Sequence, residues 1–305
     1  MGFLHLLQGI RIPLFDSIFS AITQLGEETA FIVVGIIFFW CINKRQGYYL
    51  LSVGFAGTVI NNWLKLIFRI PRPWVRDNTL TVVGDAKDAA TGYSFPSGHT
   101  QTAVGLFGGI ALSSKRLLLR IVCIAICLLV PFSRMYLGVH TPIDVTVGAL
   151  VSLSLVLGVY PVIFKATNSH LAMRLLFGGM TVLSVCYLLF VSLYSFPENV
   201  DVHNLASGTK QAYTMLGCIL GLWLTYELDE RFINFSTRGA WWAQIIKVVL
   251  GLIPILLIKS VLKAPLYMLL GEGPLADGVR YFLMTAFAGC VWPLTFKLFN
   301  RTKKQ

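Results

Sequence analysis

Three short strings in this sequence combine cationic, hydroxyl and imidazole side chains that could bind an anion and move a proton. They are Lys65-x6-Arg72-Pro73, Pro96-Ser97-Gly98-His99 and Ser133-Arg134-x5-His140-x3-Asp144. Taken singly, each string also has a structural explanation: two cations at a membrane boundary, an ordinary helix start, or a local His–Asp hydrogen bond. The combination of all three therefore decides which chemistry is expected.

The first string predicts where one helix ends, and the second predicts where the next one begins. Lys65 is expected on the last turns of a helix that the following prolines end, so Arg72 lies on an extended segment that can turn back toward Lys65. Ser97 suits the N-cap of the next helix, which leaves the backbone N–H groups of Gly98 and His99 free to face an anion.

The third string predicts an oriented histidine. Thr141 and Pro142 suit the N-cap and first position of a helix, so Asp144 falls one turn in, close to His140. A carboxylate there can accept one ring N–H and hold the other ring nitrogen unprotonated and nucleophilic.

Together, the strings bring three cations and two histidines to one place. At membrane depth this would be an electrostatic liability unless an anion regularly occupied the space between them, and phosphate fits best. The positive charge argues against a catalytic metal ion, although His99, His140 and Asp144 could be mistaken for three ligands. We therefore expect no metal and no other cofactor.

At every signature position, the three strings resemble the signature of the type-2 phosphatidic acid phosphatases and the related vanadium haloperoxidases. The resemblance covers about residues 48–165 and implies a helical core with its site at the extracytoplasmic end. It implies that His140 attacks phosphorus, that Asp144 orients its ring, and that His99 protonates the leaving oxygen and then activates water. It also implies five phosphate-binding residues: Lys65, Arg72, Ser97, Gly98 and Arg134.

The elements that must position these residues are transmembrane helices. With 56% hydrophobic and 13% charged residues, the 305-residue chain has too little polar surface for a soluble globule of its size. Apolar runs predict an all-α, polytopic bundle of about nine spans: 24–43, 48–68, 98–114, 117–137, 142–164, 173–195, 211–227, 242–262 and 280–297. The run at 98–114 is short for a full bilayer, so its His99 end is expected below the membrane surface.

The motif residues all precede residue 165, which suggests a division of the chain into three parts. We expect an N-terminal interfacial helix and first span in 1–47, a catalytic core in 48–165, and four chemically plain spans in 166–305. The layout also resembles that of the glucose-6-phosphatases of the same superfamily.

The net charge of +11 could indicate a nucleic-acid partner, but the basic residues are scattered between apolar segments instead of gathered on one face. Anionic lipid headgroups are the better partner. The six cysteines fall within apolar stretches and lack metal-binding or redox spacing. The sequence indicates no oligomeric state.

Sidedness follows from the basic residues between the spans. One set of connections is rich in them and is therefore expected in the cytoplasm: Lys44, Arg45, Lys115, Arg116, Arg120, Lys165, Arg174, Arg231, Arg238, Arg301, Lys303 and Lys304. This places the N-terminus, the Arg69–Tyr93 segment and the active site outside the cytoplasm. We expect a multi-pass protein of the cell membrane.

The expected function is hydrolysis of a phosphate monoester or diphosphate on a lipid. Polyprenyl diphosphate, phosphatidic acid, phosphatidylglycerophosphate and sphingoid phosphates all qualify. One alternative is a phosphatase of a water-soluble ester such as a sugar phosphate, and another is a non-catalytic transporter or scaffold. The polar segment Glu198–Asn204 is more typical of a solvated loop than of a lid or a headgroup contact.

Overall fold

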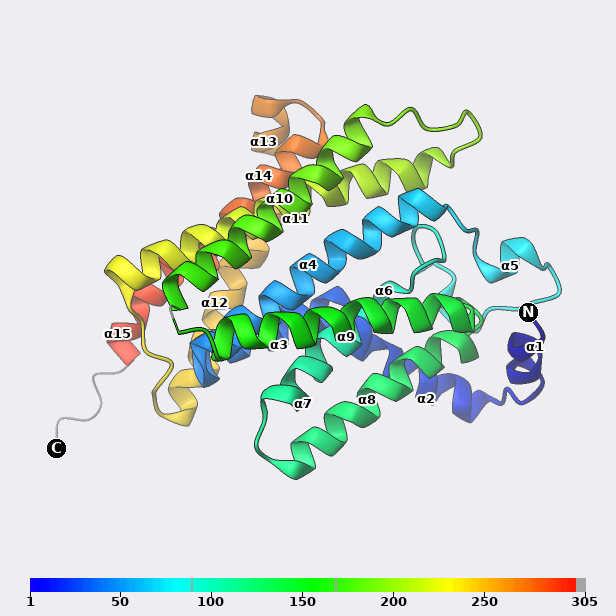
Figure 1. Ribbon diagram of the computed structural model, residues 1–305, viewed down its shortest axis with the longest axis horizontal. Coiled ribbons are helices and arrows are strands. Elements are labelled where there is room, and N and C mark those ends of the chain that lie inside the picture. Colours follow the sequence, from blue (N-terminus) through cyan, green and yellow to red (C-terminus); the bar gives the residue numbers. More distant parts are fainter. Residues whose placement is uncertain (89, 168, 300–305) are drawn as a thin grey trace. The chain divides into compact units, whose positions relative to one another are not determined.

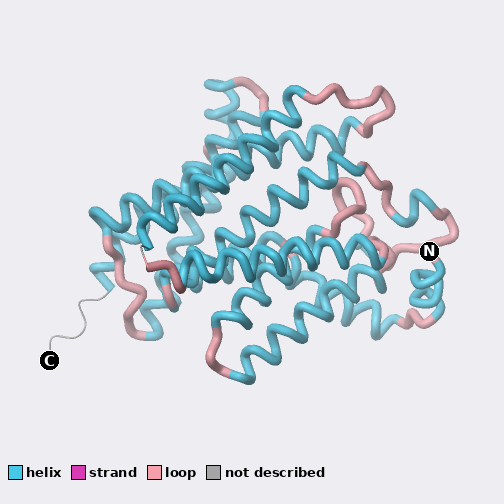
Figure 2. The backbone as a smooth tube through the Cα atoms, in the orientation of Figure 1, coloured by secondary structure: helices cyan, strands magenta, loops and turns pink. Residues whose placement is uncertain are grey.

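The computed structural model describes residues 1–88, 90–167 and 169–299, and within these ranges it contains helices and loops but no strand (Figures 1 and 2). The all-α prediction is confirmed. The chain divides into two compact units. The first consists of Met1–Val33, Ala56–Pro161 and Phe196–Gly208, and the second of Val34–Phe55, Val162–Ser195 and the described residues from Thr209 on. The three-part division drawn from the sequence stays a prediction.

The first unit holds every residue of the three strings. Its helices are α1 (Gly2–Gly9), α2 (Pro13–Thr23), the later part of α4 (Lys44–Phe68), α5 (Pro73–Arg76), α6 (Gly98–Ala103), α7 (Gly109–Ser113), α8 (Leu117–Tyr136) and most of α9 (Pro142–Phe164). A π-helical turn, Val104–Gly108, joins α6 to α7, and a 3-10 turn, Gln24–Gly26, follows α2.

Local sequence explains where these helices begin and end. α4 ends at Phe68 because Arg69 takes a left-handed conformation with φ 49° and a proline follows it closely. After α8, the chain turns at Gly138, where φ is +82° and a Cβ would lie 2.6 Å from the carbonyl oxygen of Thr81. Only glycine fits this turn, which leads from α8 into the His140 segment.

The short helix α6 is surrounded by its neighbours in the first unit. It packs on α8 and on the 3-10 turn Gln24–Gly26. The side chain of Gln101 fills the space over Gly57 of α4, and its backbone carbonyl accepts a hydrogen bond of 2.6 Å from Ser152 of α9. Because protein covers α6, this helix does not need the length or apolarity of a lipid-facing span.

The second unit contains α3 (Glu28–Ile37) from Val34 on, the first part of α4, α10 (Ser169–Leu193), most of α11 (Val202–Leu228), α12 (Trp241–Val261), α13 (Lys263–Leu270), α14 (Pro274–Ala286) and α15 (Phe296–Phe299). Trp40 is fully buried there, and its ring N–H donates to the carbonyl of Ala288 at 2.9 Å. α11 and α14 approach closely at Gly217, where a Cβ would lie 2.1 Å from the carbonyl oxygen of Gly278.

Six helical segments of the described chain are long and apolar enough to cross a membrane: Lys44–Arg76, Leu117–Tyr136, Pro142–Phe164, Ser169–Leu193, Trp241–Val261 and Pro274–Leu298. The bent pair Pro13–Gly26 and Glu28–Ile42, with 54° between its helices, makes a seventh if it is one span. The predicted count of about nine is not confirmed. The run at 98–114 is too short to qualify, and 211–227 includes polar residues that lower its hydropathy.

These helical segments carry exposed apolar side chains on their outer surfaces. Large apolar side chains such as Leu118 of α8, Leu157 of α9 and Leu175 of α10 are more than half exposed. Exposed apolar side chains along whole helices are unfavourable in water but match the hydrocarbon core of a bilayer. The chain is an integral, multi-pass membrane protein.

Candidate active site

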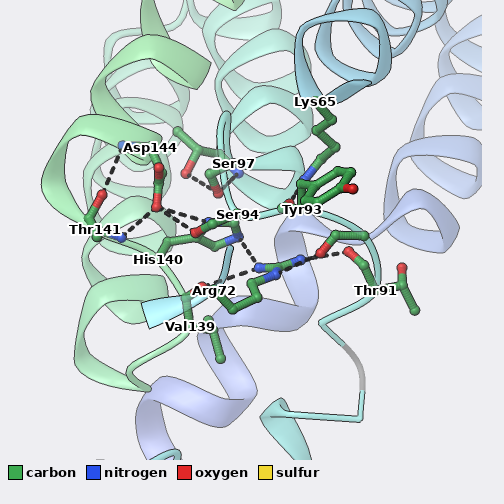
Figure 3. A network of polar contacts seen from close by, with 12 residues as sticks. Lys65, Arg72, Thr91, Tyr93, Ser94, Ser97, Val139, His140, Thr141 and Asp144 are labelled. Carbon is green, nitrogen blue, oxygen red and sulfur yellow. Dashed lines mark hydrogen bonds and ion pairs between the residues drawn. The ribbon is translucent and has the colours of Figure 1, made fainter. Parts of the chain in front are cut away.

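The structure brings the three strings together in the first unit (Figure 3). Lys65 comes from the last turns of α4, and Arg72 from the extended segment before α5. The second string leads into α6, Arg134 lies in the last turn of α8, and His140 precedes α9. Residues separated by 79 positions in sequence, from Lys65 to Asp144, thus act on one another electrostatically.

His140 is held between a cation and a carboxylate. Its Nε2 lies 2.9 Å from Nη1 of Arg72, and its Nδ1 lies 3.7 Å from Oδ2 of Asp144. Because a guanidinium can only donate, Nε2 accepts that hydrogen bond and the ring proton is on Nδ1. Burial, reinforced by the positive charges of Arg72 and Arg134, holds the pKa of His140 well below its usual value. The imidazole is therefore neutral at pH 7.

Asp144 is fixed by two short hydrogen bonds. Its Oδ2 accepts from the hydroxyl of Ser94 and from the backbone N–H of Thr141, both at 2.7 Å. The hydroxyl of Thr141 in turn accepts from the N–H of Asp144 at 3.4 Å, which caps the start of α9. Ser94 was not predicted as a site residue, because a hydroxyl side chain just before the second string matches no motif position.

Arg72 is anchored by backbone carbonyl groups. Its guanidinium donates to the carbonyl oxygens of Thr91 at 2.6 Å, Gly92 at 3.0 Å and Val139 at 3.1 Å. Lys65 donates to the carbonyl of Tyr93 in the same loop. The 91–93 loop thus holds both cations of the first string, although backbone acceptors leave no mark in a sequence motif.

The second string is tied to the third through the backbone. The N–H of Ser97 donates to the carbonyl of Asp144 at 2.9 Å. The Ser97 hydroxyl caps α6 by accepting from the N–H of Thr100 at 3.4 Å and from its hydroxyl at 3.0 Å. Gly98 and His99 begin α6 and are half-buried.

Arg134 is almost fully buried, with 1% of its surface exposed. Its Nη1 donates to the hydroxyl of Thr23 at 2.9 Å, and its Nε has no hydrogen-bond partner among the described residues. The charges of Arg134, Arg72 and Lys65 all act on His99. A buried guanidinium with spare donors beside two more cations is suited to a multiply charged anion.

The polar segment Glu198–Asn204 lies in the same unit as the three strings. The N–H of Asp201 donates to the hydroxyl of Tyr93 at 3.3 Å, and the Asp201 carboxylate accepts from the N–H of Asn204 at 2.8 Å. Glu198 and Asp201 are exposed, as a solvated loop requires, but the segment also rests on the loop that holds Lys65 and Arg72.

Within the described residues, no group of three or more His, Cys, Asp or Glu side chains is arranged to hold a metal ion. Metal independence stays a prediction about the reaction.

Two regions of the chain match family descriptions. Residues 45–168 match the PAP2 superfamily, and residues 213–304 match the PAP2 superfamily phosphatase transmembrane extension. The first region contains all eight predicted site residues. No solved structure matches the chain significantly.

Several curated proteins resemble the chain. It is 29% identical over 240 residues to a probable sphingosine-1-phosphate phosphatase of Dictyostelium discoideum, which covers 72% of this chain and 56% of that protein. It is 33% identical over 138 residues to the undecaprenyl-diphosphatase BcrC of Bacillus subtilis, covering 45% of this chain and 68% of that protein. It is 29% identical over 152 residues to phosphatidylglycerophosphatase B of Bacillus subtilis, covering 46% of this chain and 70% of that protein.

The chain thus spans little more than half of the sphingosine-1-phosphate phosphatase and about two thirds of the two bacterial proteins. The matched core and extension together take in most of the chain, and the similarity reaches the greater part of BcrC. On this evidence, the chain belongs to the PAP2 superfamily of membrane phosphatases.

Proposed function

We propose that this protein hydrolyses a phosphate monoester or diphosphate of a membrane lipid through a phosphohistidine intermediate and without a metal ion. The observation that carries the proposal is the setting of His140. Its Nε2 is an unprotonated acceptor beside Arg72, while the protonated Nδ1 faces the carboxylate of Asp144. This is the tautomer that a nucleophilic histidine needs.

In the first step, the lone pair of His140 Nε2 attacks phosphorus, and the bond from phosphorus to the ester oxygen breaks. The leaving oxygen takes the bond electrons and a proton from His99. Because burial and the nearby cations hold the pKa of His99 well below its usual value, the negative charge of the bound phosphate must keep its ring protonated for this step. Asp144 stabilises the positive charge that develops on the His140 ring. Arg72 now donates to Nε2, so a phosphoryl oxygen must take over that hydrogen bond before the attack.

In the second step, neutral His99 removes a proton from water as the water oxygen attacks phosphorus. The bond between phosphorus and Nε2 breaks, and its electrons return to His140. Inorganic phosphate leaves, and His99 is again protonated for the next cycle. Each histidine therefore ends the cycle as it began.

Five residues would hold the phosphoryl oxygens: Lys65, Arg72, Ser97, Gly98 and Arg134. The three cations would stabilise the charge that develops in the transition state, which is the role a metal ion plays in other phosphatases. The backbone carbonyls that anchor Lys65 and Arg72 support this role, because they hold the two cations in place before substrate binds.

A lipid substrate is favoured because the membrane already surrounds its chain, so the protein need supply only headgroup contacts. The printed names of three relatives describe phosphatases of sphingosine 1-phosphate, undecaprenyl diphosphate and phosphatidylglycerophosphate. Their substrates share a phosphate at the head of a long apolar chain. We extend that shared chemistry, and none of the individual headgroups, to this protein.

We also propose that the protein lies in the cell membrane with this site on the extracytoplasmic side. The support is the excess of Lys and Arg in the alternate connections. Lys115 and Arg116, between α7 and α8, are exposed members of the basic set. Arg301, Lys303 and Lys304 belong to the same set but lie outside the described residues.

The test is phosphate release by purified protein in detergent micelles, with lipid phosphates and a sugar phosphate compared with and without an excess of chelator. We expect long-chain lipid phosphates to have at least about tenfold higher kcat/KM than the sugar phosphate, near 1.4 kcal/mol, with no effect of chelator. Better turnover of the sugar phosphate would support the soluble-ester alternative. Loss of activity with chelator, restored by a divalent ion, would overturn the metal-free mechanism, and no turnover at all would favour a transporter or scaffold.

A further inference from the structure

The residues that precede the family match reach into the site. The PAP2 match begins at residue 45, yet α2 and the 3-10 turn Gln24–Gly26 contact both Arg134 and His99. These contacts lie within the first unit, which includes Met1–Val33. No sequence pattern connected the N-terminal interfacial segment with catalysis.

Thr23 is the contact to Arg134. Both residues are buried, with 5% and 1% of their surfaces exposed. The Thr23 hydroxyl accepts from Nη1 of Arg134 at 2.9 Å, whereas Nε of Arg134 has no partner in the described part of the chain. One edge of the guanidinium is thus held by Thr23, and its other donors stay available to an anion.

Gly26 and Glu27 act at the same place. A Cβ on Gly26 would lie 2.8 Å from the carbonyl oxygen of His99, 3.0 Å from its Cβ and 2.8 Å from Val130. The backbone of the turn therefore lies directly against His99, and a larger residue would displace one of them. The half-buried carboxylate of Glu27 acts electrostatically on Arg134.

The segment that carries these residues is fastened to the end of α8. The hydroxyl of Tyr136 donates to Asp16 at 2.8 Å, and Nε of Arg11 donates to the carbonyl of Tyr136 at 3.0 Å. The rings of Phe19 and Tyr136 are 4.5 Å apart. Since Tyr136 follows Arg134 on α8, these contacts fix α2 relative to the guanidinium that Thr23 holds.

We infer that the N-terminal segment through Glu27 is part of the active site. Thr23 is a positioning residue that orients Arg134 toward the phosphoryl group. Gly26 allows the close backbone contact that determines the position of His99. The inference rests on the proposed function. The inference goes beyond the proposed function because it assigns a role in phosphate binding to residues outside the three strings and outside the matched core.

The experiment compares Thr23→Val, which keeps the shape but removes the acceptor, with Thr23→Ser, which keeps the hydroxyl. Ser17→Ala is the matched control, because its hydroxyl lies on the same helix and donates to the carbonyl of Pro13. For each variant, full-length protein in detergent is assayed for kcat and KM with a lipid phosphate and for vanadate affinity by the vanadate-induced shift in Tm.

We expect Thr23→Val to raise KM and the vanadate Kd, each by about five- to tenfold, which is within the range of one lost ordinary hydrogen bond. Thr23→Ser and Ser17→Ala should keep wild-type values. Gly26→Ala should lower kcat more than it raises KM, since it displaces His99. In an Arg134→Lys background, Thr23→Val should have no further effect on vanadate affinity, because its only role in binding passes through the guanidinium.

Wild-type KM and vanadate affinity in Thr23→Val would overturn the inference. So would a loss of vanadate affinity on Thr23→Val that is as large in the Arg134→Lys background as in the wild-type background. If Thr23→Val and Thr23→Ala both fail to fold while Thr23→Ser folds, Thr23 serves stability alone and the inference is again wrong. Failure of the proposed function looks different, because the wild-type protein itself would then release no phosphate.

Discussion

Nη1 of Arg72 lies 2.9 Å from Nε2 of His140, on the side of the ring opposite Asp144. The nitrogen proposed to attack phosphorus is thus unprotonated but covered by a cation. A phosphoryl group that enters the site would accept the Arg72 hydrogen bond and expose Nε2 in the same movement. Substrate binding and activation of the nucleophile would then be one event.

The first prediction concerns the nucleophile and its partner. His140→Ala should abolish turnover, and Asp144→Asn should lower kcat by roughly 10³- to 10⁴-fold, because a neutral amide no longer stabilises the charged ring. Ser94→Ala is a graded control, since it removes a single donor to Asp144 and should have a far smaller effect. The measurement is phosphate release from a lipid phosphate. Turnover near wild type in His140→Ala would refute the mechanism.

The second prediction concerns the guanidinium of Arg72. Arg72→Lys keeps the charge but cannot donate to Thr91, Gly92 and Val139 together, so the 91–93 loop should loosen. We expect kcat/KM to fall on the order of 100-fold, about 2.7 kcal/mol of transition-state stabilisation. Arg76→Lys, at an exposed position on α5, should change little and serves as the control. Equal kinetics for the two variants would contradict the anchoring role of Arg72.

The third prediction concerns pH and stability. The pKa of buried His140 is lowered in the folded protein and returns to about 6.5 on unfolding. As the pH falls, His140 is therefore protonated in the unfolded state before it is protonated in the folded state. The stability that comes from neutral His140 is therefore fully present above about pH 6.5 and is lost as the pH falls below it. Between pH 7.5 and 5, Tm should fall more for wild type than for His140→Asn.

His203→Asn is the control for that comparison, because His203 is exposed and its replacement should leave the wild-type slope unchanged. Parallel curves for wild type and His140→Asn would show that His140 does not titrate differently on unfolding. A steeper fall in His140→Asn would reverse the sign of the expected linkage.

The fourth prediction concerns sidedness. Lys87→Cys and Lys115→Cys place matched thiols at two exposed positions on opposite proposed sides of the membrane. The background should carry Cys186→Ser, since Cys186 is exposed. An impermeant thiol reagent added to intact cells should label Lys87→Cys and spare Lys115→Cys. The opposite pattern would place the active site in the cytoplasm.

The sequence by itself determined the parts of this protein that depend on local chemistry. Apolar runs indicated a helical membrane protein, because the bilayer leaves few other ways to satisfy the backbone. α4 ended near Lys65, where the following prolines predicted its end, and Ser97 and Thr141 capped α6 and α9 as their types predict. The spacing of the three strings also indicated the family, since motif residues are read directly from the chain.

Only the tertiary structure decided which groups surround those residues. Arg72 is held by backbone carbonyls, which every residue carries and no motif reveals. Thr23 reaches Arg134 across 111 positions, and Ser94 reaches Asp144 across 50, through packing that local patterns do not encode. The predicted span at 98–114 is too short to qualify as a span, and the structure shows that its first helix, α6, packs against protein. A hydropathy reading cannot distinguish protein neighbours from lipid.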